Sequence, residues 1–216
     1  MQALNILNRL FSQNYAENKS SHTPSLFYRA VTAGNTDYTA MDYTIDAMAV
    51  FIGGGETTGA LVGNTLYFLA TLPHLQNAAR QKPALLRTIV QETMRLESPL
   101  QMTRRRVASP LTLGGVELKI GDNVLLCLGA ANRDDRQFAE PQTFNPERKN
   151  GGKQLGFGVG MHQCLGQLLA QRQAELVCGS LLNTFPALRY LGASPPQWQE
   201  SSLILRALSS LPLSLN

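Results

Sequence analysis

The sequence predicts a mainly α-helical protein with small β-sheets, and three observations support that fold class. Apolar residues recur at helical spacing over much of residues 1–97. From residue 98 to 131, short alternating runs are separated by glycine turns, which is typical of strands. A leucine-rich stretch then follows from 164 to 185. Because no repeat or low-complexity tract interrupts the chain, a single domain is expected over residues 1–216.

The expected elements follow in chain order. The long central helix ends before Leu72-Pro73, because a residue that precedes proline disfavours the α conformation. Glycine turns separate the strand-like runs, and residues 132–152 form a loop. The predicted helices span residues 1–18, 25–33, about 39–71, 73–80, 83–97 and 164–185, with a turn at 34–37; the strand-like runs are 107–113, 116–120, a buried run at 124–128 and hairpin strands in the tail, 188–216.

The composition excludes several classes of protein. The 216 residues are 44% hydrophobic, which is enough to bury a core. A net charge of +4 is too weak by itself to indicate nucleic-acid binding. The most apolar stretch, 47–72, contains Glu56, Asn64 and three glycines, so it is a poor membrane span. Three cysteines without a CxxC pair favour a reduced, cytoplasmic protein.

Residues 157–166 carry the most informative motif, Phe-Gly-Val-Gly-Met-His-Gln-Cys-Leu-Gly. A glycine-rich loop is expected to deliver Cys164 to the first turn of a helix, where unpaired N–H groups and the helix dipole favour a thiolate. Such a thiolate suits haem iron, and Phe157 could shield the sulfur. A lone cysteine at a helix start is more often a small buried apolar residue. The glycine spacing matches neither a dinucleotide nor a phosphate loop.

Two further motifs carry polar side chains on helices. Gly53-Gly54-Gly55 weakens the long helix by roughly 1 kcal/mol per glycine relative to alanine, which indicates a groove beside Glu56 and Thr57. The alternative is a helix kink with a threonine hydroxyl bonded to a backbone carbonyl. Glu92 and Arg95 lie on one helix face, where an ordinary surface ion pair is the alternative to a structural role.

Taken whole, the pattern FGxGxHxCxG resembles the haem-binding signature of cytochromes P450 of the soluble bacterial type. The resemblance implies haem b with Cys164 as the axial iron ligand. Gly158 and Gly166 would belong to the haem-binding loop. His162 would meet a haem propionate, against the alternative of a solvated loop histidine.

The resemblance extends to other segments in the family's order. It implies that Glu56 and Thr57 are an acid and an alcohol that manage protons during oxygen activation, with Gly53 and Gly54 beside the oxygen site. It also implies a buried structural triad of Glu92, Arg95 and Arg148, which fixes the loop of Cys164; alone, Arg148 would be a solvated cation. Arg106 of an Arg-x-Ala pattern would pair with a propionate, and Arg105 remains an alternative. The residues implied to face substrate are Phe51, Leu100, Met102 and Leu203.

The implied activity is that of a haem-thiolate monooxygenase acting on a small organic substrate, with electrons from a separate ferredoxin or reductase. The resemblance covers only the C-terminal half of the family fold, so a truncated fold is expected. A haem-binding module that acts redox-neutrally, one subunit of a split enzyme, and a relic without haem are the alternatives. The long helix is apolar nearly all round, so its surface is expected to be buried. A second copy of this chain or a partner chain would cover it; the alternative is that residues 1–38 of the same chain fold back on it.

Overall fold

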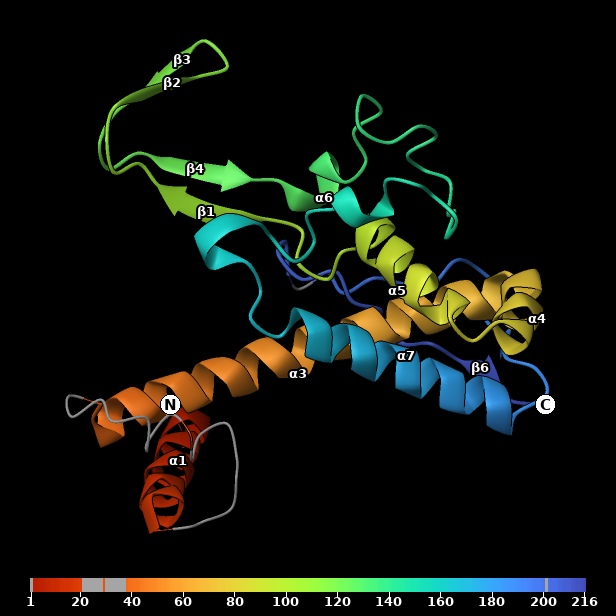
Figure 1. Ribbon diagram of the computed structural model, residues 1–216, viewed down its shortest axis with the longest axis horizontal. Helices are drawn as coiled ribbons and strands as arrows, with labels where there is room; N and C mark the ends of the chain where they lie inside the picture. The colour runs from red at the N-terminus through yellow and green to blue at the C-terminus, as the bar shows by residue number, and fades with distance from the viewer. Residues whose placement is uncertain (1, 21–28, 30–37, 201) are drawn as a thin grey trace. The chain divides into compact units, whose positions relative to one another are not determined.

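The computed structural model describes residues 2–20, 29, 38–200 and 202–216 (Figure 1). The chain divides into two compact units, residues 1–56 and 57–216, and one long helix contributes to both. The single domain expected over residues 1–216 stays a prediction. Apart from Arg29, the helix expected over 25–33 and the turn at 34–37 lie outside the described residues.

The first unit pairs α1 (Gln2–Ser20) with the beginning of α3 (Ala40–Thr71). The rings of Tyr15 and Tyr43 meet edge to face at 5.4 Å, and the Tyr43 hydroxyl donates to Asn14 Oδ1 at 3.2 Å. Tyr43 and Ala47 are buried as a result. Part of residues 1–38 therefore folds back on the long helix.

The start of α3 is fixed by a capping box. The Asp42 backbone N–H donates to Thr39 Oγ1 at 3.3 Å, while Asp42 Oδ2 accepts from the Thr39 backbone N–H at 2.8 Å. The hydrogen bonds from the Thr39 hydroxyl and then from its backbone N–H lower the pKa of the Asp42 carboxyl. The helix ends at Thr71, before Leu72-Pro73, as the sequence predicts.

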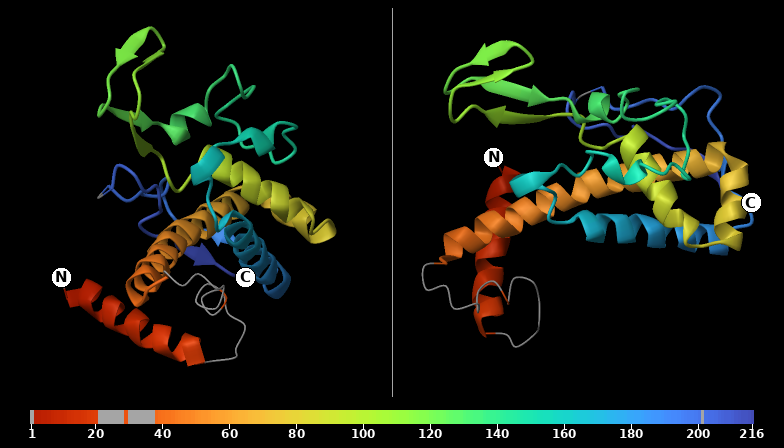
Figure 2. Two further views of the ribbon diagram at one scale, coloured as in Figure 1. Left: turned by 60° about the vertical axis from the view of Figure 1, so that its left-hand side comes forward. Right: turned by 45° about the horizontal axis from the view of Figure 1, so that its top comes forward.

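Three longer helices follow α3 in the second unit (Figures 1 and 2). They are α4 (Pro73–Gln81), α5 (Leu85–Leu96) and α7 (Gln167–Thr184), and α5 packs against α7. One core cluster joins α3, α5 and α7 to the loop before α7. Its members are Leu61, Val90, Met94, Phe157 and Ala174.

The other core cluster lies among α3, α4, α5 and α7 and contains Cys178. Burial raises the pKa of the Cys178 thiol to about 12. This cysteine therefore packs as a small apolar residue, whereas Cys127 and Cys164 are exposed.

The strands form three antiparallel pairs. β1 (Thr103–Arg106) pairs with β4 (Asn123–Leu126), β2 (Leu111–Leu113) with β3 (Val116–Leu118), and β5 (Arg189–Tyr190) with β6 (Leu213–Ser214). Gly114 and Gly115 both have positive φ, +58° and +81°, and form the two-residue turn of the β2–β3 hairpin. That hairpin projects beyond the β1–β4 pair (Figure 1).

One expectation about the strand region is wrong. The run 124–128 is not buried throughout, because Leu125 and Leu126 lie exposed on a sheet of only two strands. The arginines at 104–106 belong to strand β1. Residues 132–152 contain little regular structure, as expected; α6 (Leu128–Ala131) precedes them, and η1 (Gly151–Lys153) and η2 (Gly160–His162) are single turns.

Candidate functional site

The loop before α7 is shaped by two glycines in the left-handed conformation. Gly158 has φ +68° and Gly160 has φ +76°, values that residues with a Cβ rarely adopt. The Gly158 N–H donates to the Leu155 carbonyl at 2.8 Å, and the Cys164 N–H donates to the Phe157 carbonyl at 2.8 Å. The loop is therefore closed by its own backbone, and Cys164 is tied to Phe157.

Cys164 is exposed but does not lie in the first turn of a helix. The helix α7 begins at Gln167 with Gly166 as its N-cap, three residues later than the sequence predicts. The Cys164 N–H donates to the Phe157 carbonyl, a bond that closes the loop on itself. The thiol thus belongs to the loop that leads into α7.

The side chains around this cysteine divide between core and surface. The Phe157 ring is buried among Val90, Met94 and Ala174, so the residue anchors the loop in the core. Its expected role as a shield for the sulfur stays a prediction. On the surface, Met161 and Leu165 are 95% and 91% exposed, unusual values for side chains of this kind.

Arg105 and Arg106, the two arginines considered as propionate partners, lie on opposite faces of strand β1. Arg105 and Thr103 share one face of β1, and the Arg105 guanidinium donates to Thr103 Oγ1 at 3.2 Å and to the Arg104 carbonyl at 2.9 Å. Arg106 is exposed on the opposite face, and His162 is exposed in η2. Arg106 is therefore the more accessible of the two candidate arginines.

The glycine triplet lies inside α3. Gly53, Gly54 and Gly55 are all helical and exposed, and a Cβ built at any of them meets nothing within 4 Å. Glu56 is exposed, and Thr57 follows it in the same helix. The groove expected beside Glu56 and Thr57 and the kink considered as its alternative both stay predictions.

The structure brings together two of the segments expected to face substrate. The Gln101 N–H donates to the Ile204 carbonyl at 2.8 Å, and Leu100 forms a β-bridge with Leu205. Leu100 and Met102 are therefore neighbours of the turn that carries Leu203, which is 86% exposed. Phe51 belongs to the first unit, where its ring meets that of Phe11 at 6.0 Å.

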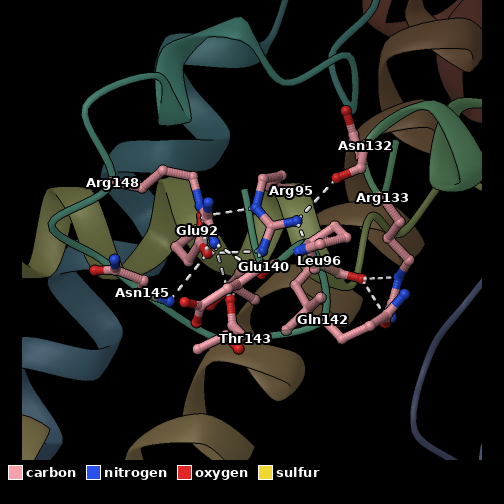
Figure 3. A network of polar contacts seen from close by, with 12 residues as sticks. Glu92, Arg95, Leu96, Asn132, Arg133, Glu140, Gln142, Thr143, Asn145 and Arg148 are labelled. Atoms are coloured by element: carbon pink, nitrogen blue, oxygen red, sulfur yellow. Dashed lines mark hydrogen bonds and ion pairs between the residues drawn. The ribbon is translucent and has the colours of Figure 1, made fainter. Parts of the chain in front are cut away.

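The Arg95 guanidinium is buried and fully hydrogen-bonded (Figure 3). The side chain is 0% exposed, and all five N–H groups donate. Nε and Nη2 donate to Glu92 at 2.9 and 2.7 Å; Nη1 donates to the carbonyls of Asn132 and Pro141, both at 2.8 Å; and Nη2 also donates to the Thr143 carbonyl at 3.1 Å. The surface-pair alternative for Glu92 and Arg95 is therefore wrong.

Arg148 joins the same network (Figure 3). Its Nε lies 3.3 Å from Glu92 Oε1, which also accepts from the Asn145 N–H at 3.0 Å. The Arg148 guanidinium donates to the carbonyls of Ala139 and Glu140 as well. Glu140 has φ +47°, a conformation that is uncommon for a residue with a side chain. The structure thus brings Glu92, Arg95 and Arg148 together and links them to a strained loop.

The sequence reasoning missed a second ionic network. Glu97 pairs with Arg133 Nη2 at 2.8 Å and with Arg206 Nε. The Arg206 guanidinium lies 3.8 Å from the Trp198 ring centroid, and Asn64 Nδ2 donates to the carbonyls of Glu97 and Arg206. The acidic residue directly after the Glu92 helix was the only local signal. This network ties the segment after Leu203 to the end of α5.

The residues around Cys164 fit a haem group. A single thiolate suits an iron whose other ligands come from a macrocycle. A Cβ built at Gly160 or Gly166 meets nothing within 4 Å, so a flat group can approach the loop backbone. The exposed side chains of Met161 and Leu165 supply apolar surface beside the thiol.

A mainly helical fold with an exposed cysteine on a glycine-rich loop is the arrangement of a haem-thiolate protein, and a family model described as cytochrome P450 matches residues 1–211. The chain belongs to the cytochrome P450 family. Within the part of the chain that the structure describes, no helix is long and apolar enough to cross a membrane.

Curated relatives match most of this chain but less than half of their own length. A putative cytochrome P450 140 of Mycobacterium tuberculosis is 37% identical over 166 residues, 77% of this chain and 37% of the relative. The 6-deoxyerythronolide B hydroxylase of Saccharopolyspora erythraea is 35% identical over 178 residues, 82% of this chain and 44% of the relative.

Solved structures confirm the predicted fold class. The P450 monooxygenase TamI, free of ligand, superposes with a TM-score of 0.90 at 35% identity, covering 98% of this chain and 52% of TamI. P450BioI in complex with an acyl carrier protein gives 0.85 at 30% identity, covering 100% of this chain and 54% of P450BioI. The chain therefore spans about half of these solved P450 chains.

We expect Arg95→Lys to lower the free energy of unfolding by about 3 kcal/mol, because lysine cannot replace five directed bonds and leaves buried acceptors unpaired. Urea denaturation followed by circular dichroism measures the change. Arg87→Lys, an exposed arginine in the same helix, is the matched control and should change the stability by less than about 0.5 kcal/mol. Equal effects of the two substitutions would contradict the structural role of Arg95.

Proposed function

We propose that this chain is the haem-thiolate part of a cytochrome P450 monooxygenase and holds haem b through Cys164. The observation that carries the proposal is an exposed thiol on a glycine-rich loop, anchored in the core by Phe157. Gly166 leaves room for a flat group beside the loop, and the positive φ of Gly158 shapes the turn that closes it. Arg106 and His162 would each donate to a propionate, and the hydrogen bonds already made by Arg105 support Arg106 over its neighbour.

When bound, haem with a thiolate ligand supplies cleavage of dioxygen, so that one oxygen atom enters the substrate and the other leaves as water with two protons and two electrons. The chain's own residues would manage those protons. Glu56 would act as the acid and Thr57 as the alcohol, since they adjoin in α3. Gly53 and Gly54 would leave the helix surface open beside them.

The substrate would be a small organic molecule held mainly by apolar contacts. Phe51, Leu100, Met102 and Leu203 would supply those contacts. Electrons would come from a separate ferredoxin or reductase. One related structure, CYP109E1 from Bacillus megaterium, is solved in complex with corticosterone, which makes this steroid a reasonable first probe.

A second candidate is a haem-binding module that acts redox-neutrally, or one subunit of a split P450. Turnover of a bound probe with added redox proteins separates the candidates, since only the monooxygenase consumes electrons and releases a hydroxylated product.

We also propose that a second copy of this chain covers exposed apolar side chains of α3. Although α1 packs on this helix, Met41, Ile45, Phe51 and Ile52 remain more than half exposed. Exposed apolar side chains gathered on one helix often mark a protein–protein interface. A symmetric dimer is the commonest oligomer that buries such a surface.

The first prediction concerns the iron ligand. Cys164→Ala should abolish the thiolate-type Soret band of the reduced carbon monoxide complex, because the only thiol on the glycine-rich loop is removed. Absorption spectra of purified, haem-loaded protein measure it. Cys127→Ala, at the other exposed cysteine, should leave the band unchanged. A normal band in the Cys164 variant would show that the ligand lies elsewhere.

The second prediction concerns proton delivery. Thr57→Ala should raise peroxide release at the expense of product, because general acid–base help of this kind is typically worth about 10² to 10⁴ in rate. The ratio of product to electrons consumed, measured with a probe that shifts the haem spectrum, reports the change. Thr58→Ala is the neighbouring control. If both variants keep the wild-type ratio, the proposed role of Thr57 is wrong.

The third prediction concerns assembly. Light scattering of the haem-loaded protein should give about twice the chain mass of 23.6 kDa. Ile45→Glu should shift the distribution to the monomer, whereas Glu17→Gln, an exposed substitution in α1, should not. A monodisperse wild-type monomer that binds little hydrophobic dye would argue against the dimer.

A further inference from the structure

We propose that Asn132 is a positioning residue that couples the buried Glu92–Arg95 pair to the loop carrying Cys164. Through that loop it would fix the place of the thiol. The inference rests on the proposed function only where it concerns haem. The coupling itself is a property of the chain and can be measured without the cofactor.

The contacts of Asn132 reach two other segments of the chain. The residue is 0% exposed and directly follows α6. Its carbonyl accepts from Arg95 Nη1 at 2.8 Å, its Nδ2 donates to Ser98 Oγ at 2.9 Å, and its Oδ1 accepts from the Leu155 N–H at 2.6 Å. One residue thus connects the Arg95 guanidinium, the end of α5 and the start of the cysteine loop.

The path from Leu155 to the thiol consists of short backbone bonds. The Leu155 carbonyl accepts from the Gly158 N–H, and the Phe157 carbonyl accepts from the Cys164 N–H, both at 2.8 Å. Between them, a Cβ at Gly156 would lie 2.5 Å from Met94 Sδ, so the loop is pressed directly on α5. Because these bonds connect Leu155 to Cys164 through a tightly packed loop, a displacement of Leu155 should also displace Cys164.

The amide of Asn132 suits this position because it offers a donor and an acceptor at once. Substitutions can test the donor bond to Ser98 and the acceptor bond from Leu155 separately. Asn132→Leu removes both side-chain bonds at similar volume, and Asn132→Asp keeps an acceptor for the Leu155 N–H. Ser98→Ala removes only the partner of Nδ2 and leaves the Leu155 bond in place, which makes it the matched control.

The first measurement is hydrogen exchange on the haem-free protein. Asn132→Leu should speed exchange of the amides at 155–164 about tenfold, the effect of losing one buried hydrogen bond on local opening. Exchange in α4 should stay unchanged, and Ser98→Ala and Asn132→Asp should keep the loop protected. If Asn132→Leu does not fold, Asn132→Ala takes its place with the same expectation. Equal loop exchange in wild type and the variant, or equal loss in Ser98→Ala, would overturn the coupling.

The second measurement uses the haem-loaded protein. Asn132→Leu should convert part of the thiolate-type Soret band of the reduced carbon monoxide complex into the band of a protein without thiolate ligation. Ser98→Ala should retain the wild-type spectrum. If the wild type itself lacks the thiolate band, the proposed function fails while the exchange measurement still decides the coupling. If the wild type has the band and Asn132→Leu keeps all of it, Asn132 does not position the thiol.

Discussion

The organisation of the second unit depends on one buried charge, the Arg95 guanidinium. Removing such a group from water costs several kcal/mol unless every donor is paired, and here all five are. Three of the acceptors are backbone carbonyls from Asn132, Pro141 and Thr143, in a stretch with little regular structure. Few backbone hydrogen bonds of a helix or sheet fix the conformation of that stretch. Its hydrogen bonds to the Arg95 guanidinium fix the conformation instead.

The same constraint explains why strain is tolerated nearby. Glu140 has a positive φ without being glycine, and its carbonyl accepts from Arg148 at 3.2 Å. Residues in this conformation persist where their surroundings determine them. Arg148 also contacts Glu92, so the carboxylate that neutralises Arg95 holds the strained turn in place as well. The loop is therefore rigid because its few polar anchors are shared.

Local signals allowed the helices to be predicted, and non-local contacts explain most of what was missed. Thr39, Asp42 and Pro73 mark the ends of α3 within a few residues of the helix itself. Cys164 was expected at the start of α7, whereas the helix begins at Gln167 and the Cys164 N–H donates to the Phe157 carbonyl, seven residues earlier in the chain. The exposure of Leu125 depends on how many strands the sheet has, which a single strand cannot reveal. Asn132 gains its importance from partners 23 to 37 residues away.

The two glycine clusters look alike in the sequence but differ physically. Gly158 and Gly160 have left-handed φ values, so their conformational freedom is required for the loop to close. Gly53, Gly54 and Gly55 are helical, where that freedom is unused and each residue costs roughly 1 kcal/mol relative to alanine. A methyl group at any of these positions would meet no atom within 4 Å, so no steric clash requires glycine. The remaining physical advantage of glycine in α3 is a bare helix surface, which matters only if another group comes to lie against it.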